Sequence, residues 1–247
     1  MILRTVGLTK HFGSLRAVNE VSLELPEGQM RAIIGPNGAG KTTLLDLITN
    51  RTAATAGRVF FQGREITGVP PHRIAAMGIG KCFQISKLFP QLSAFENVQI
   101  ACISRAHRTY AMFAPGKNAL AADVDAILES IGLGAMAGEM AGYLSYGDQR
   151  RLEIGITLGM KPSLLLLDEP TAGVSRAEGN EVMRLIQRLA SGRGLTILFI
   201  EHDMDIVFNY ADEITVMHQG AVIASGVPAE IRGNQLVQDT YLGEKTV

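Results

Sequence analysis

Apolar residues along this chain form short runs, and their spacing changes between that of strands and that of helices. Residues 3–6 and 21–25 alternate apolar and polar side chains, as half-buried strands do. The run at 164–167 is continuously apolar, and the runs at 30–34 and 195–200 are apolar except for Arg31 and Thr196. Such runs are typical of strands buried on both faces of a parallel sheet. Segments with helical spacing lie between them. The pattern predicts an α/β fold with a mostly parallel sheet.

The middle of the chain has a different character. From about residue 88 to residue 162 strand patterns are absent, and residues 93–96 and 123–131 have the features of helix starts and helix faces. We therefore expect an inserted all-helical subdomain at 88–162. The nucleotide-binding core would comprise residues 1–87 and 163–247, with a small antiparallel β subdomain formed by its N-terminal strands.

Composition limits the possible functions. The chain has 247 residues, a formal net charge of −1 and 47% hydrophobic residues. A near-neutral charge argues against nucleic-acid binding, which needs a basic excess. The apolar runs are far shorter than the roughly 20 residues of a membrane-spanning helix, and two cysteines, Cys82 and Cys102, are too few for a disulfide framework. We expect a soluble intracellular protein, and its apolar composition is compatible with binding to a membrane partner.

Residues 35–43 carry the strongest chemical signal. They fit the pattern G-x-x-x-x-G-K-[ST], with an apolar strand before them and a helical segment after them. Glycines let backbone N–H groups turn toward phosphate oxygens, and the start of a helix adds partial positive charge. Lys41 can reach the β- and γ-phosphates and Thr42 can ligate Mg²⁺. The alternative is a glycine-rich turn that binds nothing. The expected nucleotide contacts are Gly35, Pro36, Asn37, Gly38, Ala39, Gly40, Lys41, Thr42 and Thr43.

Two carboxylates follow the buried run at 164–167. Ligands of parallel sheets lie beyond the carboxyl ends of the strands, which is where Asp168 and Glu169 stand. Asp168 suits a Mg²⁺ partner opposite Thr42, and Glu169 can polarise an attacking water as general base. The structural alternative is that the two acids only cap the next turn.

Five further positions are weak signals when each is taken alone. Phe12 could stack on a nucleotide base or cover core, Gln84 could complete a metal shell or be a surface amide, and His202 could contact a γ-phosphate or make an ordinary polar contact. Ser145 can cap the helix that follows it. The small residue Gly147 in that helix's first turn makes a second potential anion site.

The order of these motifs resembles the ATP-binding subunit of ABC transporters over nearly the whole chain. The resemblance implies that Lys41, Glu169 and His202 are catalytic, and that Mg²⁺ is held by Thr42, Gln84 and Asp168. It also implies a head-to-tail dimer in which each ATP lies between one subunit's phosphate loop and the other's signature motif. Phe12 then matches the adenine-stacking aromatic, and Ser145, Tyr146 and Gly147 belong to the signature.

Details of the chain are most similar to the branched-chain amino acid importer type of this family. They lie at residues 144–147, 150–155, 201–204 and 241–243, while residues 46–49 are reminiscent of the urea branch. This type also handles short amides and aromatic acids. It implies permease subunits, a second ATP-binding subunit of the same or another kind, and a periplasmic solute-binding protein. The chain would then lie peripherally at the cytoplasmic face of the inner membrane.

Two departures and two alternatives stay open. Asp148 stands where the signature usually has Gln, and Ser175 where the following loop usually has Asp. The alternatives are the ATPase of a lipopolysaccharide-export system and a soluble ABC ATPase without a membrane partner. We expect the permease to dock on residues 85–100, where Leu88, Phe89 and Phe95 could form a socket or could be the helical subdomain's own core.

Overall fold

The computed structural model describes residues 1–82, 88–105 and 117–242 of the chain. Its centre is a six-stranded sheet in the order β10-β9-β3-β8-β7-β6. Neighbouring strands from β9 to β6 run parallel, and only β10 is antiparallel to its neighbour β9. The mostly parallel sheet is therefore confirmed. Its strands are β3 Met30–Ile34, β6 Ile79–Cys82, β7 Leu164–Asp168, β8 Thr196–Ile200, β9 Glu213–His218 and β10 Ala221–Gly226.

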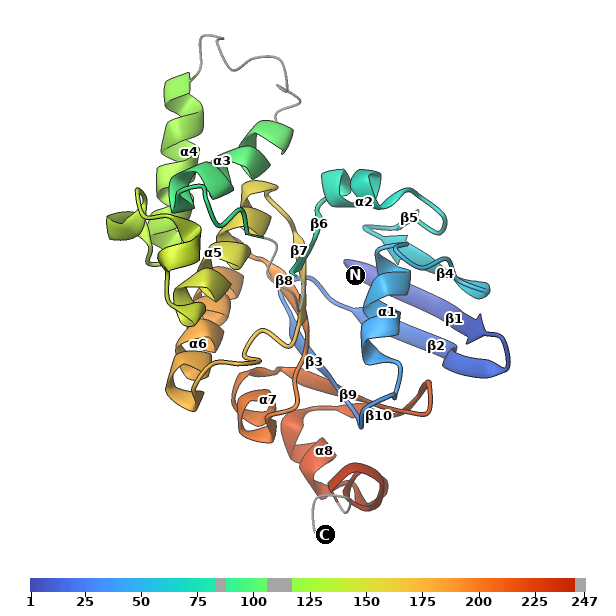
Figure 1. Cartoon of the computed structure of the whole chain (residues 1–247). Coiled ribbons are helices and arrows are strands. Elements are labelled where there is room, and N and C mark those ends of the chain that lie inside the picture. The colour runs from blue at the N-terminus through green and yellow to red at the C-terminus, as the bar shows by residue number, and fades with distance from the viewer. Residues whose placement is uncertain (83–87, 106–116, 243–247) are drawn as a thin grey trace.

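A second, four-stranded sheet is antiparallel throughout and has the order β2-β1-β4-β5. Helix α1, Lys41–Ile48, lies between the two sheets (Figure 1). Its leucines share one apolar cluster with Leu3 of the small sheet and Ile33 of the large one. This packing fixes the start of α1 above the end of β3. The strands are β1 Leu3–Phe12, β2 Leu15–Leu25, β4 Ala56–Phe61 and β5 Arg64–Glu65.

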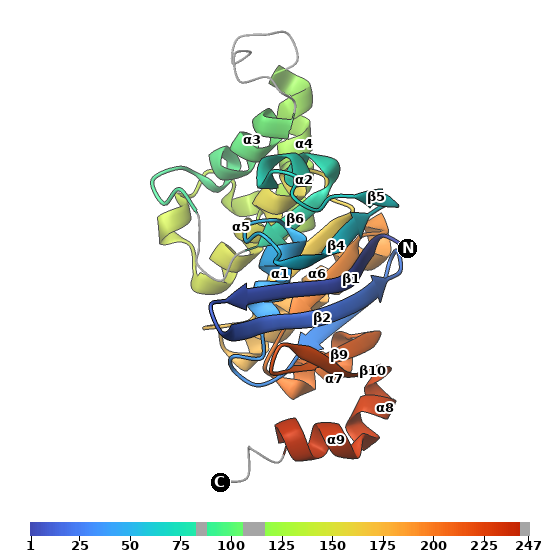
Figure 2. The same ribbon diagram turned by 90° about the vertical axis from the view of Figure 1, so that its right-hand side faces the viewer.

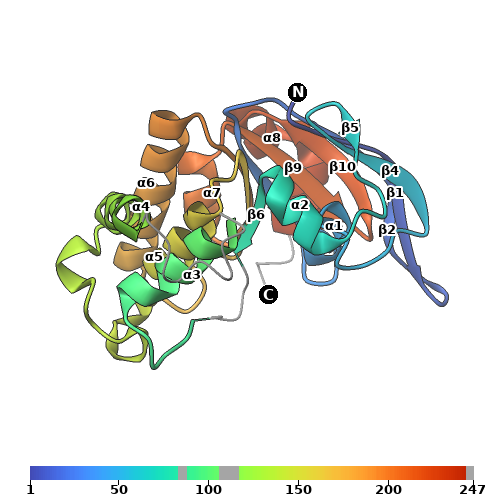
Figure 3. The same ribbon diagram turned by 90° about the horizontal axis from the view of Figure 1, so that it is seen from above.

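Helices cover the opposite side of the large sheet. Figure 3 shows α3 to α6 gathered on one side of it and the small sheet on the other. Among the described residues between 88 and 162, the named elements are all helices, and none is a strand. Ser93 and Glu96 form the expected capping box at the start of the first of these helices. The elements are α3 Ala94–Arg105, α4 Lys117–Ser130, η1 Gly134–Met136, η2 Ala141–Tyr143, α5 Tyr146–Gly159 and α6 Arg176–Arg193.

The helical segment and the sheet share one core. A single apolar cluster contains Val98 of α3, Leu128 of α4 and Leu158 of α5 together with Leu165 and Phe199 of the sheet. The helices therefore pack directly on the sheet, and the subdomain limits at residues 88 and 162 stay a prediction. Within the described ranges, no helix is both long and apolar enough to cross a bilayer.

Two short helices were not anticipated from the sequence. Helix α2, Pro71–Met77, follows the small sheet, and α7, Met204–Tyr210, follows β8. The C-terminal part forms α8, Pro228–Gly233, α9, Gln235–Val237, and a π-helical turn at Gln238–Leu242. Figure 2 shows this part below the two sheets, at the end of the molecule away from α3 and α4.

Candidate active site

The glycine-rich segment joins the end of β3 to the start of α1. Gly40 has φ +94°, and a Cβ atom on it would lie 2.1 Å from the carbonyl oxygen of Ala17. Only glycine fits there, because both the backbone conformation and the close approach of β2 exclude a side chain. The segment is thus shaped by contacts with the small sheet as well as by its own sequence.

Lys41 opens helix α1 and folds back over this loop. Its Nζ donates to the carbonyl oxygens of Gly35, at 2.7 Å, and Pro36, at 2.9 Å. Burial lowers the pKa of Lys41, while the carboxylates of Glu169 and Asp168 oppose that shift. The ammonium therefore lies at the mouth of the loop, between backbone carbonyls and two acids, where it can meet the charge of a bound phosphate.

Thr42 and Asp168 face each other across the end of the sheet. The Thr42 hydroxyl donates to Asp168 Oδ1 at 3.3 Å. Burial raises the pKa of Asp168, and the nearby Lys81 ammonium acts in the opposite direction. Lys81 itself pairs with Asp46 on α1, at 2.8 Å.

A hydroxyl and a carboxylate are the hard oxygen donors that Mg²⁺ takes. No group of three or more His, Cys, Asp or Glu side chains gathers as a metal cage in the described part of the chain. Mg²⁺ usually keeps several waters and is bound through one or two protein oxygens and substrate phosphates. Thr42 and Asp168 therefore fit Mg²⁺ held together with a nucleotide. Gln84 lies outside the described residues.

Glu169 and His202 meet at the ends of adjacent strands β7 and β8. Their side chains are 2.9 Å apart, from Nε2 to Oε1. Glu169 has φ +52°, a conformation that costs free energy in a residue other than glycine. Its backbone N–H donates to the carbonyl of Ile200 at 3.0 Å, which holds this conformation and turns the carboxylate toward His202.

The sequence analysis missed the role of Glu201. Its Oε1 accepts from the backbone N–H of Thr171, at 2.9 Å, and from the Thr171 hydroxyl, at 2.6 Å. Its Oε2 accepts from the backbone N–H of His202 at 3.1 Å. Burial raises the pKa of Glu201. This side chain joins the loops that carry Glu169 and His202. A carboxylate at the end of an apolar strand was the available signal.

One cavity of about 320 Å³ brings most of the predicted residues together. Phe12 lies at its rim with 52% of its surface exposed, so this ring does not cover core. The Lys10 ammonium lies 4.9 Å from the centre of the ring. The cavity lining comprises Phe12, Leu15, Ala17, Asn37, Gly38, Ala39, Gly40, Lys41, Thr42, Thr43, Glu169 and His202.

Ser145, Tyr146 and Gly147 do not line this cavity. They stand at the start of α5, where the Ser145 hydroxyl accepts the backbone N–H of Asp148 at 3.1 Å. Ser145 and Tyr146 are exposed, and the Tyr146 hydroxyl accepts from Arg150 at 2.8 Å. Within one chain the two predicted anion sites are therefore separate surfaces.

Comparison with known proteins settles the family. The ABC transporter family model matches residues 18–172. The high-affinity branched-chain amino acid transport ATP-binding protein BraF of Pseudomonas aeruginosa is 40% identical, over 98% of each chain. The chain belongs to the ABC transporter ATP-binding family. The corresponding protein LivG of Salmonella typhimurium is 42% identical to this cassette, again over 98% of each chain.

Further comparisons agree with this family. A family model for the branched-chain amino acid ATP-binding cassette transporter matches residues 221–246 of the cassette. A solved ATP-binding cassette in its ADP conformation has a TM-score of 0.88 and 33% identity, covering 98% of both chains. A nucleotide-free cassette has a TM-score of 0.86 and 32% identity, covering 97% of this chain and 98% of that one. The cassette is therefore an ATPase.

The predicted permease socket is only partly available on the cassette. Leu88 and Phe95 pack against the core cluster shared by the helices and the sheet. They belong to the core, which was one of the two readings left open. Phe89 keeps 53% of its surface exposed. Its backbone N–H donates to the Asn97 side chain at 2.9 Å, which holds this exposed turn against α3.

Proposed function

We propose that this cassette hydrolyses ATP to power an importer of branched-chain amino acids or related small polar solutes. The observation that carries the proposal is similarity along the whole chain, at 40–42% identity, to proteins named for branched-chain amino acid transport. The family match at residues 221–246 supports the same type.

ATP binding in this proposal uses the cavity beside α1. Phe12 stacks on the adenine, and the backbone of residues 35–43 surrounds the phosphates together with Lys41. Thr42 and Asp168 would supply oxygen ligands to Mg²⁺, with Gln84 as a further ligand. Bound Mg²⁺ neutralises charge on the phosphate oxygens. The Lys41 ammonium already contacts the carbonyls of the phosphate loop, so rotation of its side chain would bring it to the β- and γ-phosphates.

Hydrolysis in this proposal depends on Glu169 and His202. The Glu169 carboxylate accepts a proton from the attacking water, and His202 orients that carboxylate and contacts the γ-phosphate. Both residues line the cavity, and their contact at 2.9 Å supports a shared role. Glu201 supports them from beneath, because it binds the backbone on both loops.

The second half of the ATP site comes from another subunit in this proposal. A solved ABC transporter cassette, 26% identical with a TM-score of 0.79, is described as a dimer in a post-hydrolysis state bound to ADP and phosphate. In the same way, Ser145, Tyr146 and Gly147 of one subunit would cover ATP in the phosphate loop of the next. The partner is a second copy or a different ATP-binding subunit.

The proposed membrane partners are permease subunits, with a periplasmic solute-binding protein that delivers the cargo. The cassette then lies peripherally on the cytoplasmic face of the inner membrane. Phe89, exposed at the start of the helical segment, is the proposed contact with a permease loop. An exposed aromatic side chain beside packed helices suits such a contact.

Reconstitution tests the cargo directly. The cassette, its permease subunits and its solute-binding protein are placed in vesicles with internal ATP. Uptake of radiolabelled leucine, isoleucine and valine is compared with that of urea and acetamide. We expect ATP-dependent uptake of the branched-chain amino acids, absent with Lys41→Ala. ATP-dependent uptake of urea or acetamide alone would move the cargo to the amide branch. Uptake of none of these solutes by an ATP-hydrolysing complex would contradict the proposed importer.

A further inference from the structure

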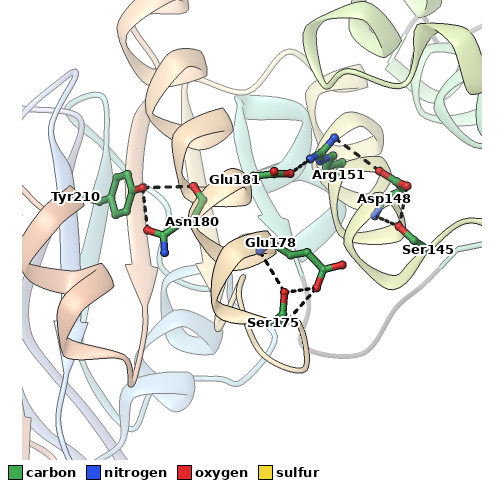
Figure 4. A network of polar contacts seen from close by, with 8 residues as sticks. All are labelled: Ser145, Asp148, Arg151, Ser175, Glu178, Asn180, Glu181 and Tyr210. Carbon is green, nitrogen blue, oxygen red and sulfur yellow. Dashed lines mark hydrogen bonds and ion pairs between the residues drawn. The ribbon is translucent and has the colours of Figure 1, made fainter.

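The hydroxyl of Ser145 already has an acceptor within its own helical turn. It donates to Asp148 Oδ2 at 2.7 Å, while its oxygen accepts the Asp148 backbone N–H at 3.1 Å (Figure 4). A serine hydroxyl carries one hydrogen to donate. The hydrogen that Ser145 would donate to a phosphate oxygen is therefore engaged by a carboxylate, and hydrogen bonds to a carboxylate are stronger than those between neutral groups.

A cation lies on the other side of that carboxylate. Arg151 NH1 is 3.7 Å from Asp148 Oδ1, which is an ion-pair distance but too long for a hydrogen bond. The same guanidinium binds Glu181 on α6, from NH2 to Oε2 at 2.5 Å. Figure 4 shows Arg151 between the two acids. Arg151 is thus close enough to receive the Asp148 carboxylate if that carboxylate leaves Ser145.

Other serine caps in the chain show what is particular here. At Ser93 and Ser175 the acid three residues on is a glutamate, which reaches back to the backbone N–H of the capping serine at 2.8 and 2.9 Å. The Ser175 hydroxyl also donates to Glu178 Oε2, at 2.6 Å. Those two pairs stabilise a helix start in the ordinary way. Asp148 is one methylene shorter and, like Glu178, accepts from the hydroxyl of the capping serine. What is particular at Ser145 is that this hydroxyl belongs to the predicted signature motif. The Asp148 carboxylate also stands at a helix N-terminus that would otherwise attract an anion.

We propose that Asp148 is a positioning residue that restrains Ser145 and raises the ATP concentration at which two subunits close on ATP. This inference rests on the proposed function, in which Ser145 covers the partner's nucleotide. A γ-phosphate must break the Ser145–Asp148 hydrogen bond and must approach a second negative charge. Both terms oppose closure. Arg151 reduces the penalty, because it can take up the released carboxylate.

The test measures dimer formation rather than turnover. Sedimentation velocity follows the dimer fraction as ATP and Mg²⁺ are added to the Glu169→Gln protein, alone and mixed with the second ATP-binding subunit of its system. Asp148→Asn keeps the side-chain size and removes the charge, and Asp148→Gln introduces the residue more usual at this position. We expect either change to lower the ATP concentration for half-maximal dimer by roughly three- to tenfold.

Two controls make the result specific. Glu230→Gln removes an acid from the first turn of α8, far from the signature, and should leave the ATP concentration unchanged. Adding Ser145→Ala to Asp148→Asn should abolish the gain, because the restraint acts through that hydroxyl. Thermal melts of each variant, followed by circular dichroism, check that the helix start is retained.

The outcomes separate the inference from the function on which it rests. A dimer that is weakened by Ser145→Ala, but that forms at an unchanged ATP concentration with Asp148→Asn and Asp148→Gln, overturns only the restraint. The same gain in the presence and absence of Ser145 also overturns it, since the effect would then be general charge repulsion. No ATP-dependent dimer in any mixture overturns the shared ATP site, and the restraint with it.

Discussion

The phosphate-loop surface and the signature surface are built in different ways. Around Lys41 and Asp168 the chain is buried, and positions are fixed by strand ends and by backbone contacts such as that between Gly40 and Ala17. Around Ser145 the chain is exposed, and its contacts are side-chain hydrogen bonds and an ion pair at the start of one helix. The first surface encloses a cavity within one chain. The second faces outward and needs another molecule to complete a site.

This difference separates binding from closure. Residues of the first surface should decide whether ATP binds and is hydrolysed. Residues of the second should decide at what ATP concentration two subunits associate, with little effect on the binding of ATP to one chain.

The largest expected effect is at Glu169. Glu169→Gln keeps the shape of the side chain and removes the basic carboxylate, and loss of a general base typically costs about 10² to 10⁴ in rate. ATP affinity, measured by equilibrium binding, should be retained because the phosphates are held elsewhere. Glu24→Gln, on the exposed face of the small sheet, is the matched control. Turnover equal to that of the wild type would remove Glu169 from the general-base role.

Lys41→Ala comes next. It removes a buried cation at the mouth of the phosphate loop, and loss of one such electrostatic contact costs roughly 10² to 10³ in rate. Unlike Glu169→Gln, it should also weaken ATP binding. Lys161→Ala, at an exposed lysine just after α5, controls for the loss of a positive charge. Steady-state ATPase assays and ATP binding are compared for both variants. Equal ATP affinity in the wild type and Lys41→Ala would contradict the assignment.

A smaller effect is expected at Phe12. Its half-exposed ring lies at the cavity rim, so Phe12→Ala should cost about 1 kcal/mol of ATP binding, roughly fivefold in affinity. The affinities for GTP and ATP should fall alike, because stacking on the face of a base does not depend on the groups at its edge. Leu15→Ala removes another exposed apolar side chain from the same rim. Its effect on ATP affinity is compared with that of Phe12→Ala, because only Phe12 has a ring that can stack on the base. An unchanged affinity after Phe12→Ala would place the base elsewhere.

The smallest expected effect is a pH dependence of the free energy of unfolding that arises from the buried Glu201. Burial raises the pKa of Glu201 above its usual 4.5, so the folded chain holds the proton at pH values where the unfolded chain has lost it. The free energy of unfolding should therefore fall as pH rises from 4.5 through the folded-state pKa. Glu201→Gln should flatten this slope in urea titrations without nucleotide. An unchanged slope would show that Glu201 does not titrate in that window.

Much of the phosphate-loop surface could be predicted from local sequence. The run at 30–34 became β3 and the run at 164–167 became β7, because short runs of mainly apolar residues fit strands covered on both faces. Lys41 opens a helix as the motif required. Position at the end of a strand is a local property, so candidates such as Asp168 can be named without a structure.

Contacts between distant segments could not be predicted in this way. Glu169 and His202 could be predicted from the sequence. The hydrogen bonds by which Glu201 joins Thr171 to the His202 backbone could not. Helices α2 and α7 have seven residues each, too few to show a clear helical period. The use of Leu88 and Phe95 as core rather than as a docking surface likewise depends on which helices pack over them.

The most direct test of the division between the two surfaces is the response of the Glu169→Gln protein to ATP with and without Ser145→Ala. Sedimentation velocity, on the chain alone and mixed with its partner ATP-binding subunit, measures association, and ATP binding to the single chain is measured in parallel. We expect ATP and Mg²⁺ to drive Glu169→Gln into a dimer. With Ser145→Ala added, the dimer should be weakened, so that it forms only at higher ATP concentrations, while each chain still binds ATP. A dimer equally strong without the Ser145 hydroxyl would contradict the account, because the signature surface would then not close over the partner's nucleotide.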